Sequence, residues 1–139
     1  MLLGFKARFV PMVEDGSKTH TIRAKRKIRP RVGETCHCYT GLRRKGARLL
    51  GRWECVRVED ILVYERGDAT MGVVIEGVEL TPDEKNELAW RDGFRSNGKR
   101  RAFAEMAAYW LKLHAQKEGP FVFEGVVIHW LRSQQRGRK

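Results

Sequence analysis

The chain has 139 residues, of which 42% are hydrophobic and 32% charged. A chain of this length fits one compact domain, and this share of apolar residues excludes disorder of the whole chain. The formal net charge is +11 at pH 7. A strong positive field therefore surrounds the protein, and nucleic acid is the partner that the composition favours.

The first forty residues predict a strand, a short helix and two further strands. The segment LLGFKARF begins as an apolar strand, and apolar residues at helical spacing follow it until Gly16 ends the helix. The β-branched segment KTHTIR predicts a strand directly after this glycine turn. A basic loop separates it from the next predicted strand, in VGETCHCYTG.

The rest of the chain predicts three more strand segments and two helices. LLGRWECVRVEDILVYE predicts a long strand, and GVVIEGVEL a hairpin centred on residues 76–77. Thr81, Pro82 and Glu84 form a capping box that opens a helix, and Gly93 ends that helix. FAEMAAYWLKLH predicts a helix with one apolar face, and FVFEGVVIHW predicts the last strand.

These elements predict an α+β fold. Five or six strands and two or three modest helices, mostly without βαβ alternation, favour a small mixed β-barrel with the helices packed around it. We expect a single domain over residues 1–131, followed by a basic and flexible tail over residues 132–139.

The cysteines indicate a reducing, cytoplasmic setting. There are three of them, an odd number, and no signal peptide or membrane-length apolar run precedes or accompanies them. On a strand, Cys36 and Cys38 point to one face and His37 to the other, and no second pair of ligands lies at a suitable spacing. We therefore expect packed thiols, with no metal and no cofactor.

Lys18 and Thr21 are candidates for a reactive pair. On a regular strand Thr21 would not share a face with Lys18, so the two side chains converge only if the chain bends after Gly16. A lysine whose ammonium is destabilised by burial could then act as a base toward the threonine hydroxyl. The alternative is a solvated basic loop, because Lys-x-x-Thr spacing is common by chance.

Basic residues near this pair could hold phosphate groups. The candidates are Arg23, Lys25, Arg26, Lys27, Arg29 and Arg31, with a second run at Arg43 and Arg44. For each run the alternative is a solvated charged face. Tyr39, Trp53 and Trp90 could stack on bases, although core packing is the alternative for all three.

The segments DGSKTHTIR and RVGETCHCYTG resemble the signature of the ASCH domains, members of the PUA-like superfamily of small β-barrels. The family motif is Gly-x-Lys-x-x-Glu-x-Arg. This chain supplies Gly16, Lys18 and Arg23, and it carries Thr21 where many members have glutamate. The similarity extends more loosely through LAWRDGF to FEGVVIHW, and so covers most of the chain.

The threonine variant is similar to small bacterial ASCH amidohydrolases that remove the acyl group from N4-acetylcytidine with a lysine, a threonine and a glutamate. The resemblance implies that Thr21 attacks the acyl carbonyl and that Lys18 is the base. It places Asp92 at the glutamate position, with Glu87 as the alternative. It also implies a nucleoside-sized cleft that Gly16, Ser17 and His20 help to form, with backbone N–H groups near Gly16 meeting the oxyanion.

Other ASCH proteins are described as RNA-binding proteins or ribonucleases, so a non-catalytic RNA-binding module and a ribonuclease are the alternatives. A binding module accounts better for the net charge of +11, because a free nucleoside carries no phosphate. We expect RNA or a nucleoside or nucleotide ligand, with single-stranded nucleic acid included. No membrane and no obligate protein partner are expected.

Overall fold

The computed structural model describes residues 1–42, 45–66, 70–114 and 119–132. Within these residues, one seven-stranded sheet and three α-helices confirm the predicted α+β class. Arg43 and Arg44 lie outside the described residues, as do residues 133–139 of the predicted tail. Arg132, the first residue of that tail, is held in place: its Nη1 donates to the Glu14 carbonyl at 2.7 Å.

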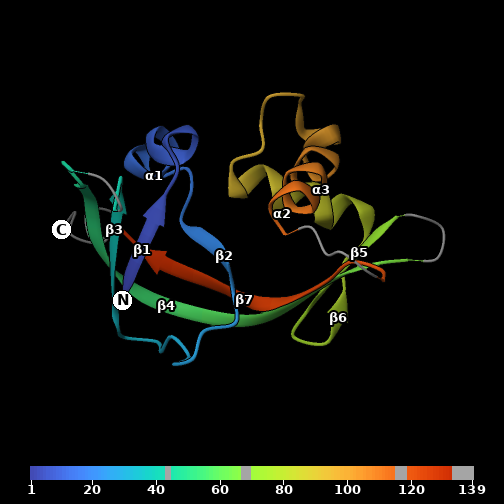
Figure 1. Cartoon of the computed structure of the whole chain (residues 1–139), viewed down its shortest axis with the longest axis horizontal. Coiled ribbons are helices and arrows are strands. Elements are labelled where there is room, and N and C mark those ends of the chain that lie inside the picture. Colours follow the sequence, from blue (N-terminus) through green and yellow to red (C-terminus); the bar gives the residue numbers. More distant parts are fainter. Residues whose placement is uncertain (43–44, 67–69, 115–118, 133–139) are drawn as a thin grey trace.

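Two long antiparallel strands form the axis of the sheet (Figure 1). The strands are β1 (Leu2–Phe5), β2 (His20–Ala24), β3 (Thr35–Thr40), β4 (Arg48–Glu65), β5 (Met71–Ile75), β6 (Val78–Glu79) and β7 (Val122–Leu131). β4 pairs with β3 near its start, with β5 near its end, and with β7 from Glu54 to Tyr64. β1 lies parallel to β3, β2 lies antiparallel to β7, and β6 extends the sheet beyond β5.

The closed barrel that we predicted is not formed. The edge strands of the sheet are β1, β2 and β6, and no backbone pairing joins β1 to β2 in the described residues. A side chain spans the opening instead: Arg23 Nη2 on β2 donates to the Gly4 carbonyl on β1 at 2.6 Å. A strand ladder needs the two backbones to lie about 4.8 Å apart, and here a guanidinium occupies the space between them.

The helices begin and end where the sequence predicts. They are α1 (Val10–Asp15), α2 (Pro82–Asp92) and α3 (Ala102–Leu113), and short 3₁₀ turns precede α1 and α3. The predicted capping box opens α2: Glu84 N donates to Thr81 Oγ1 at 3.2 Å, and Thr81 N donates to Glu84 Oε1 at 2.8 Å. Gly93 ends α2 with a φ of 114°. The predicted hairpin turn is also confirmed, with positive φ at both residues 76 and 77.

The core lies between the sheet and the helices. Val126, Val127 and Ile128 are consecutive and all buried, because β7 lies between β2 and β4 and is covered on both faces. The Trp53 and Trp130 rings stack at 6.2 Å. The cysteines are buried in the core, as expected. None of the helices in the described ranges is long and apolar enough to cross a bilayer.

Candidate functional site

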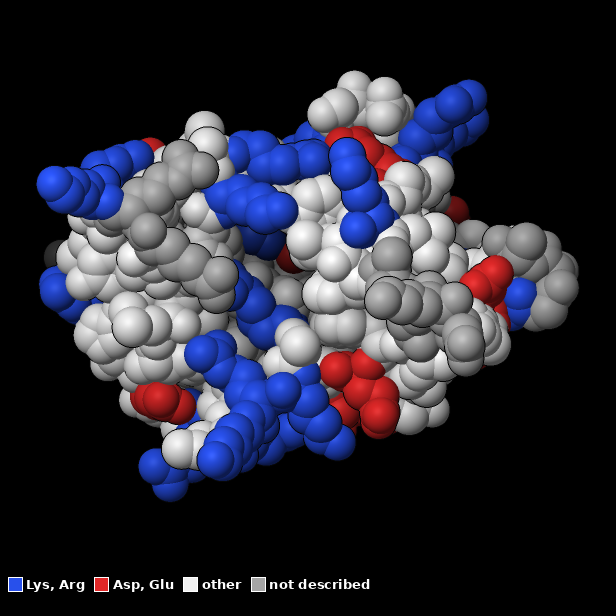
Figure 2. Space-filling model, viewed as in Figure 1, with Lys and Arg blue, Asp and Glu red and all other residues white. Residues whose placement is uncertain are grey.

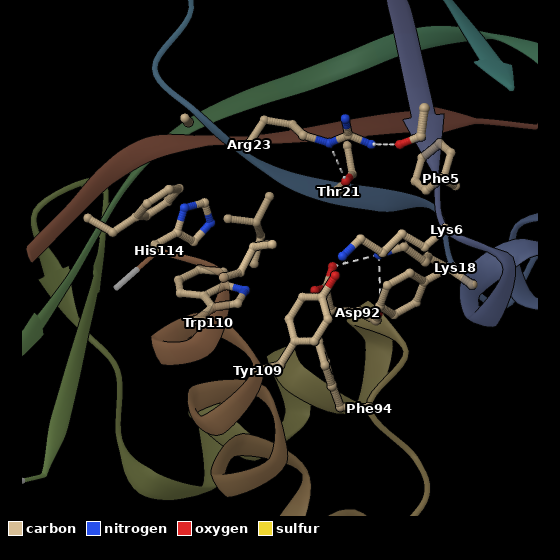
Figure 3. Close-up of a pocket in the computed structure, with 16 residues that line it drawn as sticks. Phe5, Lys6, Lys18, Thr21, Arg23, Asp92, Phe94, Tyr109, Trp110 and His114 are labelled. Carbon is tan, nitrogen blue, oxygen red and sulfur yellow. Dashed lines mark hydrogen bonds and ion pairs between the residues drawn. The ribbon is translucent and has the colours of Figure 1, made fainter. Parts of the chain in front are cut away.

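A pocket of about 220 Å³ opens between the free edges of β1 and β2 and the ends of α2 and α3 (Figure 3). Its charged and polar lining consists of Lys6, Lys18, Thr21, Arg23, Asp92 and His114. Its aromatic lining consists of Phe5, Phe9, Phe94, Tyr109, Trp110 and Phe123. Six elements contribute to this one hollow: β1, β2, β7, α2, α3 and the 3₁₀ turn before α1. Polar groups therefore lie against an apolar wall.

The bend required to bring Lys18 and Thr21 to one pocket is present. Gly16 ends α1 in the left-handed region, with a φ of 85°, and the Lys18 amide then donates to the Met12 carbonyl at 3.0 Å. β2 begins only at His20, two residues later than the predicted strand. Strand alternation therefore does not apply to Lys18, and both Lys18 and Thr21 line the pocket.

Lys18 and Asp92 form a buried ion pair. Lys18 Nζ lies 2.6 Å from Asp92 Oδ1 and donates to the Asp92 main-chain carbonyl at 2.8 Å (Figure 3). The two residues are 2% and 6% exposed. Because Asp92 is the last residue of α2, its carbonyl is one of those that the helix leaves free to accept other donors. Asp92 therefore holds the ammonium with both its carboxylate and its backbone.

Burial and pairing act on both members of this pair. Burial lowers the pKa of Lys18 more than the Asp92 carboxylate raises it. Burial raises the pKa of Asp92, but the Lys18 ammonium and His20 outweigh that effect and hold the pKa below its ordinary value. Asp92 is thus ionised at neutral pH, and Lys18 gives up its proton more readily than a solvated lysine does.

Thr21 is tied to Arg23. Arg23 Nε donates to Thr21 Oγ1 at 2.9 Å, and the guanidinium lies over the Phe5 ring at 5.0 Å. A hydrogen bond from a cation polarises a hydroxyl and favours its alkoxide form. No hydrogen bond in the described residues joins Thr21 Oγ1 to Lys18 Nζ. Both side chains line the pocket, but they do not contact each other through these atoms.

The backbone N–H groups after Gly16 cannot meet an oxyanion as we predicted. The Ser17 amide donates to Asp15 Oδ1 at 2.7 Å, and the Lys18 amide is taken by Met12. Gly16 itself faces Arg132. Neither Gly16 nor Ser17 lines the pocket. The helical turn that positions Lys18 uses up these donors, and Figure 3 instead shows the Arg23 and Tyr109 side chains directed toward the hollow.

The predicted phosphate-binding residues are divided between several places. Arg23 lines the pocket, and Arg26 Nη2 lies 3.4 Å from the Leu2 carbonyl on β1. Arg29 is ion-paired with Asp60 at 2.6 Å. Lys25, Lys27 and Arg31 are exposed. Arg43 and Arg44 lie outside the described residues, and Tyr39 is half-buried on β3 and does not line the pocket.

His20 and Glu87 face a different hollow. Both line a second pocket together with Glu59 and His129. Glu87 pairs there with Arg91 at 2.9 Å and with Lys99 at 2.5 Å. Asp92, and not the alternative Glu87, therefore lies beside Lys18. His20 contacts the pair from the side, with Nε2 3.2 Å from Asp92 Oδ1.

The aromatic wall was not predicted from the sequence. Phe9 meets Phe94 and Tyr109 edge to face, and the Phe94 and Tyr109 rings are tilted by 58°, with centroid separations between 5.3 and 6.2 Å in all three pairs. Tyr109 is only half-buried, and Lys6 Nζ lies 5.2 Å from its ring centroid. On sequence alone these residues look like core positions of helices, because periodicity does not distinguish a core wall from a pocket wall.

Comparison with known proteins adds no family assignment: no protein-family model, curated protein or solved structure matches the chain at a significant level. In the described ranges, no cluster of three or more histidine, cysteine, aspartate or glutamate side chains could hold a metal ion. What the site can do is therefore inferred from its own geometry, which offers a proton-exchanging amine, a polarised hydroxyl and an aromatic wall.

Proposed function

We propose that the chain is an ASCH-type, PUA-like protein that binds the base of a modified nucleoside in the pocket beside Lys18 and hydrolyses an amide on it, of the N4-acylcytidine type. The observation that carries the proposal is the buried Lys18–Asp92 pair, at 2.6 Å, which lines the same pocket as Thr21. An amine held by a carboxylate in the same pocket as a hydroxyl supplies the base and the nucleophile that such a reaction needs.

The size and lining of the pocket support a base as the bound group. Its volume of about 220 Å³ is below the ~300–1,000 Å³ of pockets for drug-sized ligands. Aromatic side chains such as Phe94 and Tyr109 offer faces and edges to a planar ring. A shallower groove adjoins the pocket, sharing Gly4, Phe5 and Arg23 with it and continuing to Leu42, and this groove would take the sugar.

The proposed reaction balances without a metal. From its unprotonated form, Lys18 Nζ removes the Thr21 hydroxyl proton, Oγ1 attacks the acyl carbonyl, and the C–N bond breaks as that proton passes from Lys18 to the departing exocyclic amine. Water then hydrolyses the threonine ester, which releases the carboxylic acid and regenerates the hydroxyl. Arg23, which already donates to Oγ1, stabilises negative charge on that oxygen in the first step.

RNA binding is the second candidate, and the charge distribution favours it. Figure 2 shows Lys and Arg side chains along the face that holds the pocket, densest around the segment after β2. Exposed Lys25, Lys27 and Arg31 belong to that segment. A phosphate backbone lying along this surface would present one base to the pocket, and such binding weakens steeply with salt.

A ribonuclease is less well supported. His20 and His129, the two histidines that approach each other, have ring centroids 5.6 Å apart. They line the second pocket, where Glu59, Glu84 and Glu87 also lie. Arg57 and Arg91 also line this hollow, but they are ion-paired with Glu59 and Glu87. The three carboxylates outnumber the two guanidinium groups, so the hollow is a poor place to bind the phosphodiester that a ribonuclease must cut.

Turnover of N4-acetylcytidine, followed by chromatography, tests the amidohydrolase. We expect the wild type to release cytidine and acetate, and Lys18→Met to lower kcat/KM by about 100- to 10,000-fold, the usual contribution of a positioned base. Lys112→Met is the matched control, because Lys112 is exposed and does not line the pocket, so this variant should leave the rate unchanged. Absence of turnover by the wild type would refute this proposal.

Fluorescence anisotropy with a labelled single-stranded RNA tests the second candidate. We expect binding at low salt, and Lys25→Gln/Lys27→Gln should flatten the plot of log K against log salt by about 0.7 for each lost phosphate contact. Lys18→Met should still bind the RNA. No binding at low ionic strength would remove this candidate.

A further inference from the structure

A second pocket lies on the opposite face of β2 from the first. Neighbouring residues of a strand point to opposite faces, and accordingly Thr21 lines the first pocket whereas His20 lines the second. The second pocket has a volume of about 390 Å³, and His129 and Glu59 also line it. One strand therefore carries a candidate nucleophile toward one hollow and a buried histidine toward the other.

One carboxylate oxygen of Asp92 lies close to both Lys18 and His20. Its Oδ1 lies 2.6 Å from Lys18 Nζ and 3.2 Å from His20 Nε2. His20 is 4% exposed, and its Nε2 has no aligned hydrogen-bond partner in the described residues. A buried ring nitrogen without a partner is costly. At 3.2 Å, a small rotation of the ring is enough to direct an N–H at Oδ1.

We propose that His20 donates a hydrogen bond from Nε2 to Asp92 Oδ1 and competes there with the Lys18 ammonium, so that the second pocket governs how strongly Lys18 is paired. His20 is a positioning residue, since it acts on Lys18 only through Asp92 and does not line the first pocket. The effect on turnover rests on the proposed amidohydrolase function, whereas the hydrogen bond itself does not.

The charged groups around His20 come from four elements. Asp92 and Arg91 belong to α2, Lys18 precedes β2, and His129 lies on β7. Glu59 Oε1 on β4 accepts a hydrogen bond from His129 Nε2 at 2.7 Å, and Arg57 Nε lies 3.6 Å from the same oxygen. Side-chain exposure rises from 5% at His20 to 18% at His129 and 23% at Glu59. His20 is therefore the most buried of these three side chains, and it lines the second pocket and not the first.

The balance of these charges keeps His20 neutral at pH 7. Burial lowers the pKa of His20 more than Asp92 raises it, and Lys18 lowers it further. A neutral ring with its proton on Nε2 is a donor that leaves the ammonium in place. A protonated ring would bring a second cation to Oδ1 and loosen the hold on Lys18. The protonation state of His20 therefore changes the strength of the Lys18–Asp92 ion pair, and His20 does so without contact with the substrate.

Nuclear magnetic resonance of ¹⁵N-histidine-labelled protein tests the hydrogen bond without any substrate. We expect His20 to carry its proton on Nε2 at pH 7. We also expect the pKa of His20 to rise in Lys18→Met, because Asp92 Oδ1 then pairs with His20 and no longer with the Lys18 ammonium. Lys112→Met, the matched control, should leave the His20 titration unchanged, because Lys112 is exposed and lines neither pocket. A proton on Nδ1, or an unchanged His20 pKa in a folded Lys18→Met protein, would overturn the proposal.

Turnover against pH separates positioning from mere structural support. A glutamine amide nitrogen reaches the place of Nε2, whereas an asparagine amide does not. In His20→Asn, Lys18 should hold Oδ1 alone, its pKa should rise, and the acid limb of kcat/KM should move to higher pH, while His20→Gln should keep the wild-type profile. Identical profiles for the two variants contradict the coupling. If no protein turns over while the resonance result holds, only the amidohydrolase function fails.

Discussion

Breaking the Lys18–Asp92 pair from one side should destabilise the protein strongly. Asp92→Asn removes the carboxylate and leaves an ammonium whose side chain is 3% exposed. Because solvent does not screen this site, we expect the full cost of an uncompensated buried charge, about 3–5 kcal/mol. With a urea m-value of about 2 kcal/mol/M, the midpoint should fall by about 2 M at pH 7.

The loss should depend on pH in a defined direction. In Asp92→Asn the folded-state pKa of Lys18 falls further below its ordinary 10.5, so the unfolded chain binds the proton more tightly than the folded one. Stability then rises as the pH approaches that value. Urea unfolding, followed by tryptophan fluorescence, should show a smaller deficit relative to the wild type at pH 9.5 than at pH 7.

A second variant distinguishes a lost charge partner from simple damage to the core. Lys18→Met/Asp92→Leu removes both charges, and replacement of a buried ion pair by apolar groups is often neutral. It should recover most of the stability that Asp92→Asn loses. The reasoning is refuted if Asp92→Asn unfolds at the wild-type midpoint, or if its deficit is the same at both pH values.

Three further predictions concern the surrounding fold. In urea unfolding, Gly93→Ala should lower the free energy of unfolding by about 1–3 kcal/mol more than Gly33→Ala does. Both glycines have a positive φ, but only the new Cβ at Gly93 would lie 2.8 Å from a Phe9 carbon. Equal losses in the two variants would contradict this. Burial lowers the pKa of His20, His114 and His129 below 6.5. The stability that these neutral side chains contribute is therefore complete above that pH and is lost as the pH falls below it. A urea midpoint that does not fall between pH 7 and pH 5 would show that these histidines titrate normally. The pKa values of Cys36 and Cys38 are raised to about 12, largely by burial, so the native protein should not react with a thiol reagent at pH 8 and should react fully in urea; rapid native labelling would mean that the core is open.

Local signals in the sequence predicted most of the elements. The capping box at Thr81 and the glycine that ends α2 are decided by residues a few positions apart, as is the turn at residues 76–77. These features depend on hydrogen bonds and φ preferences that a short segment carries by itself. The gap between β1 and β2 could not be predicted in this way. It is spanned by a hydrogen bond from Arg23 to the Gly4 carbonyl, and no short segment contains both partners.

The site shows the same limit more sharply. Lys18 and Thr21 share one short segment, and the left-handed Gly16 begins the turn that keeps Lys18 outside β2. Asp92 lies 74 residues away from Lys18, and only the resemblance to ASCH amidohydrolases suggested it, since the spacing carries no such information. The oxyanion prediction failed because the turn that positions Lys18 also occupies the amides after Gly16.

Release of acetate from N4-acetylcytidine by two Thr21 variants tests the central claim most directly. Thr21→Ser keeps a hydroxyl beside Lys18, and Thr21→Val keeps the shape but loses the oxygen. We predict that the wild type and Thr21→Ser liberate acetate and that Thr21→Val, although folded, does not. Acetate release by Thr21→Val at the wild-type rate would contradict the role of the hydroxyl, and no release by the wild type would contradict the proposed reaction.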